Sequence, residues 1–173
     1  MFATIYLPNF YLQAALRHQP ELASRPVALI DDQVAKAVII QLNRHAEEAG
    51  VRAGMTPSQG LARSLELIVK SRARAQERSL DDLLLQFSYT LAPYVEATAP
   101  GLCTVQFTDD RNLGAKVESM IAQLTETGLT ACAGIAQTPD TSLLAAHLAR
   151  PVLQVGDIKT FLASLPIETL AMA

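Results

Sequence analysis

The sequence has no tryptophan and only two cysteines, Cys103 and Cys132, which both lie inside apolar runs. Their spacing matches no metal-binding pattern, so we expect buried free thiols. No stretch approaches the roughly 18 consecutive apolar residues that cross a bilayer, and the N-terminus lacks a basic segment followed by an apolar one. We therefore predict a soluble, cytoplasmic chain.

Positive charge is also scarce, with 14 Lys and Arg against 17 Asp and Glu. Binding to nucleic acid through charge needs a concentration of basic side chains that neutralise phosphates, so this chain alone is expected to bind DNA weakly at most. The candidates for DNA contact are four basic residues: Arg52, Lys70, Arg72 and Arg74. The charged stretch at 70–82, which holds three of them, is interpreted as a solvated connection.

Hydrophobic residues make up 50% of the 173 positions, enough for one compact unit or two small intertwined ones. Apolar runs predict strands at 4–7, 26–30, 36–42, 67–70, 101–108 and 130–136. Periodic apolar stripes predict helices from Ser79 to Pro93, from Asp109-Asp110 to Gly128, and from Thr138 to just before Pro151. The order in the second half predicts a split βαβ arrangement with helices on one sheet face.

Residues 43–66 differ from the rest because they contain short helical pieces on either side of the turn "GVRAGM". Gly50 and Gly54 permit backbone angles that other residues resist. We predict a small, mostly helical lobe inserted in the fold.

Six segments occur in an informative order: "PELASRPVALI" (20–30), "EEAGVRAGMTPSQGLARSLELIV" (47–69), "PYVEATAPGLCTVQFTD" (93–109), "GLTACAGIAQT" (128–138), "LAAHLARPV" (144–152) and "FLASLPIETL" (161–170). Together they resemble the Y-family translesion DNA polymerases of the UmuC and DinB type. The resemblance implies an α+β fold with a ferredoxin-like palm, formed by 1–10 and 76–165, and a fingers lobe at 11–75. Residues 166–173 would begin a thumb that is absent from this chain.

Such polymerases use two Mg²⁺ ions held by three acids. In the first motif an aspartate stands four residues before a pair of aromatics, and the pair Phe10-Tyr11 puts Tyr6 in its place. The later Asp-Glu pair corresponds to Gly101 and Leu102. None of these three side chains carries an anionic oxygen, which Mg²⁺ requires. We therefore expect no catalytic residue, no metal site and no cofactor.

The positions that hold the nucleotide in the family are altered as well. A tyrosine and an arginine correspond to Arg44 and Glu47, and a lysine corresponds to Leu143. Tyr11 lies where the family screens out the ribose hydroxyl, and here it is interpreted as a packing residue. We expect no nucleotide binding at these positions.

These replacements resemble those of the catalytically inactive ImuB-type homologues of bacterial damage-induced mutagenesis. The resemblance implies a non-enzymatic adaptor in the bacterial cytoplasm. Its partners would be an active error-prone polymerase, the sliding clamp and a recombinase-associated factor. Two alternatives stay open: a weakly active translesion polymerase using Asp31, Asp109 or Asp110, and a DNA-binding module using the basic residues named above.

Overall fold

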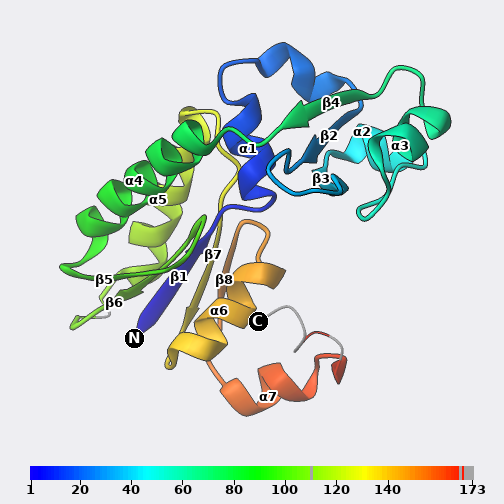
Figure 1. The fold of residues 1–173 in the computed structure, drawn as a ribbon. Coiled ribbons are helices and arrows are strands. Elements are labelled where there is room, and N and C mark those ends of the chain that lie inside the picture. Colours follow the sequence, from blue (N-terminus) through cyan, green and yellow to red (C-terminus); the bar gives the residue numbers. More distant parts are fainter. Residues whose placement is uncertain (110, 168, 170–173) are drawn as a thin grey trace. The chain divides into compact units, whose positions relative to one another are not determined.

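The computed structural model describes residues 1–109, 111–167 and 169, and it divides into two compact units (Figure 1). Unit 1 contains Met1–Pro8 and Asp81–Ala173, and unit 2 contains Asn9–Leu80. The boundaries between the two units lie after residues 8 and 80, whereas the sequence predicted them after residues 10 and 75. Most of the expected thumb segment, namely 168 and 170–173, lies outside the described residues.

Unit 1 is built on a five-stranded mixed sheet with the order β5-β6-β1-β7-β8. Its strands are β1 (Phe2–Tyr6), β5 (Tyr94–Ala99), β6 (Leu102–Gln106), β7 (Cys132–Ala136) and β8 (Val152–Gln154). The central strand β1 pairs antiparallel with β6 and β7, whereas β7 and β8 are parallel. Two of these strands, β5 and β8, are absent from the sequence prediction.

Four helices accompany this sheet in the described part of the chain: α4 (Arg74–Leu91), which begins in unit 2, α5 (Leu113–Glu126), α6 (Pro139–Leu148) and α7 (Ile158–Ala163). Helix α5 buries the apolar stripe that includes Val117, Ile121 and Leu124. The chain leaves this helix at Gly128, whose φ of 82° is readily adopted only by glycine.

Two buried polar contacts show which face of the sheet the helices cover. Thr4 on β1 bonds Ser142 of α6 at 2.7 Å, and Cys103 on β6 contacts Ser88 of α4 at 2.8 Å. Because side chains alternate along paired strands, Thr4 and Cys103 point to opposite faces. Helices therefore lie on both faces, a detail in which the structure differs from the expected single helical layer.

Unit 2 has a three-stranded sheet of order β3-β2-β4, formed by β2 (Val27–Ile30), β3 (Ile39–Leu42) and β4 (Ile68–Ser71). Its helices are α1 (Phe10–Leu16), the 3₁₀ helix η1 (Pro20–Ser24), α2 (Arg44–Glu48) and α3 (Pro57–Arg63). Thr56 and Gln59 form a capping box at the start of α3. Gly50 and Gly54 have φ of 83° and 84°, as the turn between α2 and α3 requires.

In the described residues, no helix has both the length and the apolarity to span a bilayer.

Candidate functional site

The three positions expected to replace the metal-binding acids lie together in unit 1, at one end of its sheet. Tyr6 and Leu102 are direct partners in the ladder between β1 and β6. The backbone N–H of Leu7 donates to the carbonyl of Gly101 at 2.9 Å. The fold therefore brings Tyr6 next to Gly101 and Leu102, which lie far from it in the sequence.

The surroundings of Tyr6 are aromatic and apolar. Its ring lies 4.3 Å from that of His147, centroid to centroid, and Cys132 is its partner on the neighbouring strand. Burial raises the pKa of the Tyr6 phenol and lowers the pKa of His147, so both side chains are uncharged near pH 7. Leu102 is buried. Tyr6, His147 and Leu102 are therefore neutral side chains at this end of the sheet.

The residues at these positions do not fit Mg²⁺. A neutral phenol, a glycine and a leucine offer none of the carboxylate oxygens by which proteins hold this ion. The described residues also contain no group of three or more His, Cys, Asp or Glu placed to bind a metal. Any anionic oxygen for a metal must therefore come from other side chains.

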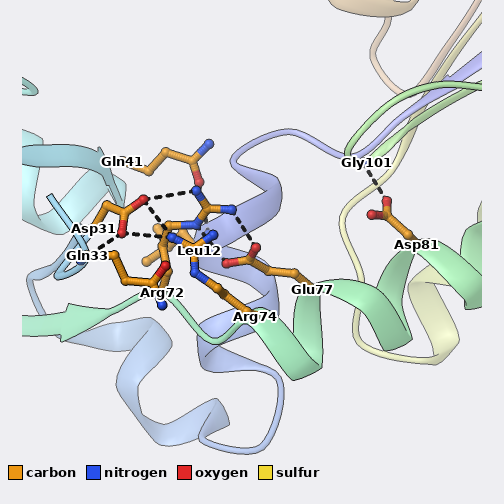
Figure 2. A network of polar contacts seen from close by, with 9 residues as sticks. All are labelled: Leu12, Asp31, Gln33, Gln41, Arg72, Arg74, Glu77, Asp81 and Gly101. Carbon is orange, nitrogen blue, oxygen red and sulfur yellow. Dashed lines mark hydrogen bonds and ion pairs between the residues drawn. The ribbon is translucent and has the colours of Figure 1, made fainter.

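The structure brings one carboxylate to this region, that of Asp81 (Figure 2). Its Oδ1 accepts the backbone N–H of Gly101 at 2.8 Å. The sequence predicts a helix that begins at Ser79, only two residues before Asp81. Helix α4 in fact begins at Arg74, so Asp81 lies in its middle and fixes the turn between β5 and β6.

The nucleotide positions predicted from the resemblance are divided between the two units. Arg44 is exposed and forms an ion pair with Glu48 at 2.7 Å, one turn along α2. Glu47 is exposed, and its backbone carbonyl accepts a hydrogen bond from Arg52. Leu143 lies on α6 in unit 1 and is half-buried. Because Glu47 is acidic and Arg44 pairs with Glu48, these two side chains do not form an anion-binding site.

Tyr11 belongs to unit 2, where the guanidinium of Arg72 lies over its ring at 3.9 Å from the centroid. Arg72 is in turn held by two carboxylates (Figure 2). It binds Glu77 through two hydrogen bonds of 2.9 and 2.6 Å, and it contacts Asp31 at 3.2 Å. Arg74 contacts both oxygens of Asp31 at 3.0 Å. We call Asp31, Arg72, Arg74 and Glu77 the Asp31 network.

The remaining candidates also have partners. Lys70 donates to the side chain of Gln19 at 2.9 Å, and Arg52 donates to the carbonyls of Glu47 and Val51. Asp109 forms an ion pair with Arg111 at 2.8 Å. Asp110 lies outside the described residues. The carboxylates of Asp31 and Asp109 therefore both form ion pairs with arginine side chains.

The Asp31 network makes the stability of unit 2 sensitive to acid. The backbone N–H of Gln33 and then the two arginines hold the pKa of Asp31 below its ordinary value. A lowered pKa gives stabilisation that is complete above the unfolded pKa, about 4, and is lost as pH falls through the folded pKa. We expect the melting temperature of Asp31→Asn to fall less steeply below pH 4 than that of the original chain.

The plot of melting temperature against pH is measured by circular dichroism. Asp32→Asn, at the exposed neighbouring position, is the control and should keep the shape of the original curve. Parallel curves for the original chain and Asp31→Asn below pH 4 would show that the network contributes nothing to the acid dependence.

The impB/mucB/samB family model matches residues 5–147. The chain belongs to this family. A DNA polymerase IV of Legionella pneumophila strain Corby is 26% identical over 175 residues, covering 93% of this chain and 48% of that protein. The DNA polymerase IV of Shewanella halifaxensis is 29% identical, covering 91% of this chain and 47% of that protein. The impB/mucB/samB chain thus spans about half the length of these relatives.

Solved structures show the same fold. DinB from Sulfolobus solfataricus matches with a TM-score of 0.84 at 15% identity, over 97% of this chain and 52% of that one. A post-insertion binary complex of Dbh DNA polymerase matches with a TM-score of 0.86, also at 15% identity, over the same shares of the two chains. These matches confirm the predicted α+β fold class, and with the family match they confirm the resemblance to Y-family polymerases.

The comparisons correct two expectations. The prediction that the chain is not an enzyme is wrong, because the impB/mucB/samB relatives that cover more than nine tenths of it are named DNA polymerase IV. The prediction of no cofactor is corrected with it, because the relatives are named DNA polymerase IV and the resemblance implies Mg²⁺ for such polymerases. Tyr6, Gly101 and Leu102 themselves offer this ion no carboxylate. Both predictions were drawn from replacements at the metal-binding and nucleotide-binding positions of the resemblance.

Proposed function

We propose that the chain supplies the palm and fingers of a DNA polymerase that acts in translesion synthesis and adds nucleotides to a primer on a damaged template. Unit 1 would be the palm and unit 2 the fingers. The observation that carries the proposal is the family match, because residues 5–147 include most of both units.

We expect this activity to be weak. Tyr6 and Leu102, which are strand partners at this end of the sheet, are neutral and cannot hold the cations that would balance the charge of a reacting phosphate. Electrostatic stabilisation of developing charge is usually the largest contribution to such catalysis.

The adaptor partners predicted from the resemblance remain predictions. These are an error-prone polymerase, the sliding clamp and a recombinase-associated factor, together with a place in the SOS response. A DNA-binding module that would use Arg52, Lys70, Arg72 and Arg74 is less well supported, because the chain has only 14 Lys and Arg against 17 Asp and Glu.

Primer extension tests the proposal. The longest natural form of the protein is purified from a host that lacks its own translesion polymerases, and it is given labelled primers on undamaged and abasic templates with Mg²⁺ or Mn²⁺. We expect slow addition that follows the template base. Addition no faster than that of a mock purification from the same host, with either ion, would overturn the proposal.

A further inference from the structure

The carboxylate of Asp31 lies between two guanidinium groups (Figure 2). Arg74 contacts both of its oxygens. Arg72, which directly follows β4, contacts one of them. Two guanidinium groups that converge on one anion form an arrangement suited to carboxylate or phosphate oxygens. The side chain of Asp31 therefore occupies a site whose chemistry would accept a phosphate.

Arg72 does not depend on Asp31 for its orientation. Two hydrogen bonds to Glu77 fix its guanidinium, and the ring of Tyr11 lies beneath it. The Arg72 side chain is 17% exposed, so few other orientations are open to it. The position of Arg72 should therefore persist when Asp31 moves away.

The site can be reached from solvent. The Arg74 side chain is 41% exposed, and Asp31 directly precedes an exposed segment at 32–36. With Asp31 in place, the charges of the two arginines and two carboxylates cancel. When Asp31 leaves, the two arginines and Glu77 together carry a net charge of +1, which attracts an anion.

We propose that Arg72 and Arg74 form a phosphate-binding site that Asp31 fills in the free chain, so that a bound phosphate displaces Asp31. Phosphate is chosen as the ligand because of the proposed function, whose substrates carry it either on a nucleoside triphosphate or in the DNA backbone. A purely structural ion pair would not exchange in this way. Removal of the Asp31 charge therefore distinguishes the two cases, because it strengthens phosphate binding if the site exchanges and leaves it at the level of a control if the ion pair is structural.

The test is the affinity of the Asp31→Asn protein for two probes, inorganic triphosphate without metal and a primer-template duplex. Glu48→Gln is the matched control, since it removes one carboxylate from another arginine pair in unit 2. We expect Asp31→Asn to bind triphosphate about tenfold more tightly than the control, a difference of about 1.4 kcal/mol. A gain with the duplex as well would show that backbone phosphates are also accepted. Triphosphate affinity equal to that of Glu48→Gln would overturn the proposal.

A second pair of variants works even if Asp31→Asn fails to fold. Arg74→Gln should weaken triphosphate binding, whereas Arg44→Gln removes the same charge from an exposed ion pair and should not. Equal affinities for these two variants would also refute the site. Because both tests measure binding without metal or extension, failure of the polymerase proposal leaves their results unaffected.

Discussion

Gly134→Ala is expected to destabilise unit 1 strongly, because β7 and α6 touch at this residue. A Cβ atom at Gly134 would lie 2.1 Å from the carbonyl oxygen of Ser142 and 2.2 Å from the backbone nitrogen of Ala146. Neither atom can move without shifting the helix. Overpacking of this kind costs about 3 kcal/mol or more. For a chain of this size, that lowers the melting temperature by about 6–12 °C.

Gly156→Ala is the control for this prediction. It adds the same methyl group in unit 1, at a glycine where no atom lies within 4 Å of the new Cβ. Thermal unfolding followed by circular dichroism should separate the two variants clearly. Similar melting temperatures would mean that the contact between β7 and α6 can open without cost.

The helices that the sequence predicted well are those whose ends are set by local chemistry. The predicted start of α6 at Thr138-Pro139 is confirmed, because the Thr138 side chain accepts from the N–H of Thr141 and proline suits a first helical position. Helix α4 was predicted to start at Ser79 and instead starts at Arg74. The residues before Ser79 are good helix formers, and buried Glu77 is fixed there by Arg72.

Two strands were missed because their local signal is weak. Five of the six residues in β5 are exposed, so it lacks the alternation of buried and exposed residues that reveals a strand. Strand β8 has only three residues. Its parallel pairing with β7 is a contact between distant segments, which a single sequence does not display.

The candidate site was partly predictable. The resemblance singled out Tyr6, Gly101 and Leu102, which do lie together. The Asp31 network was not foreseen, because Asp31 is separated from Arg72 and Arg74 by 41 and 43 positions. From the sequence, Asp31 was named only as an alternative acid for a weakly active polymerase, whereas in the structure it accepts the N–H of Gln33 and joins the network. Its second role depends on the pairing of β2 with β4, which brings the two segments together.

Carboxylates placed at Tyr6, Gly101 and Leu102 are expected to raise primer extension by about a hundredfold or more. The variant combines Tyr6→Asp, Gly101→Asp and Leu102→Glu. The new acids would be neighbours, because Tyr6 and Leu102 are strand partners and Leu7 bonds Gly101. Gly101 has a φ of 71°, which aspartate tolerates better than most residues. A site that can hold Mg²⁺ gains several kcal/mol of transition-state stabilisation, and each 1.36 kcal/mol is about tenfold in rate.

The matched control carries Asn, Asn and Gln at the same three positions, which reproduces the size of the acids without their charge. Both variants lose the buried Leu102 side chain, so melting temperatures must first show that both are folded. Calorimetry with Mn²⁺ then shows whether the acids hold a metal, and single-turnover extension measures the rate. If the acid variant binds Mn²⁺ but extends no faster than the amide variant, the strand end does not limit the reaction. The weak activity expected of the natural chain would then need a cause other than its neutral side chains at this end of the sheet.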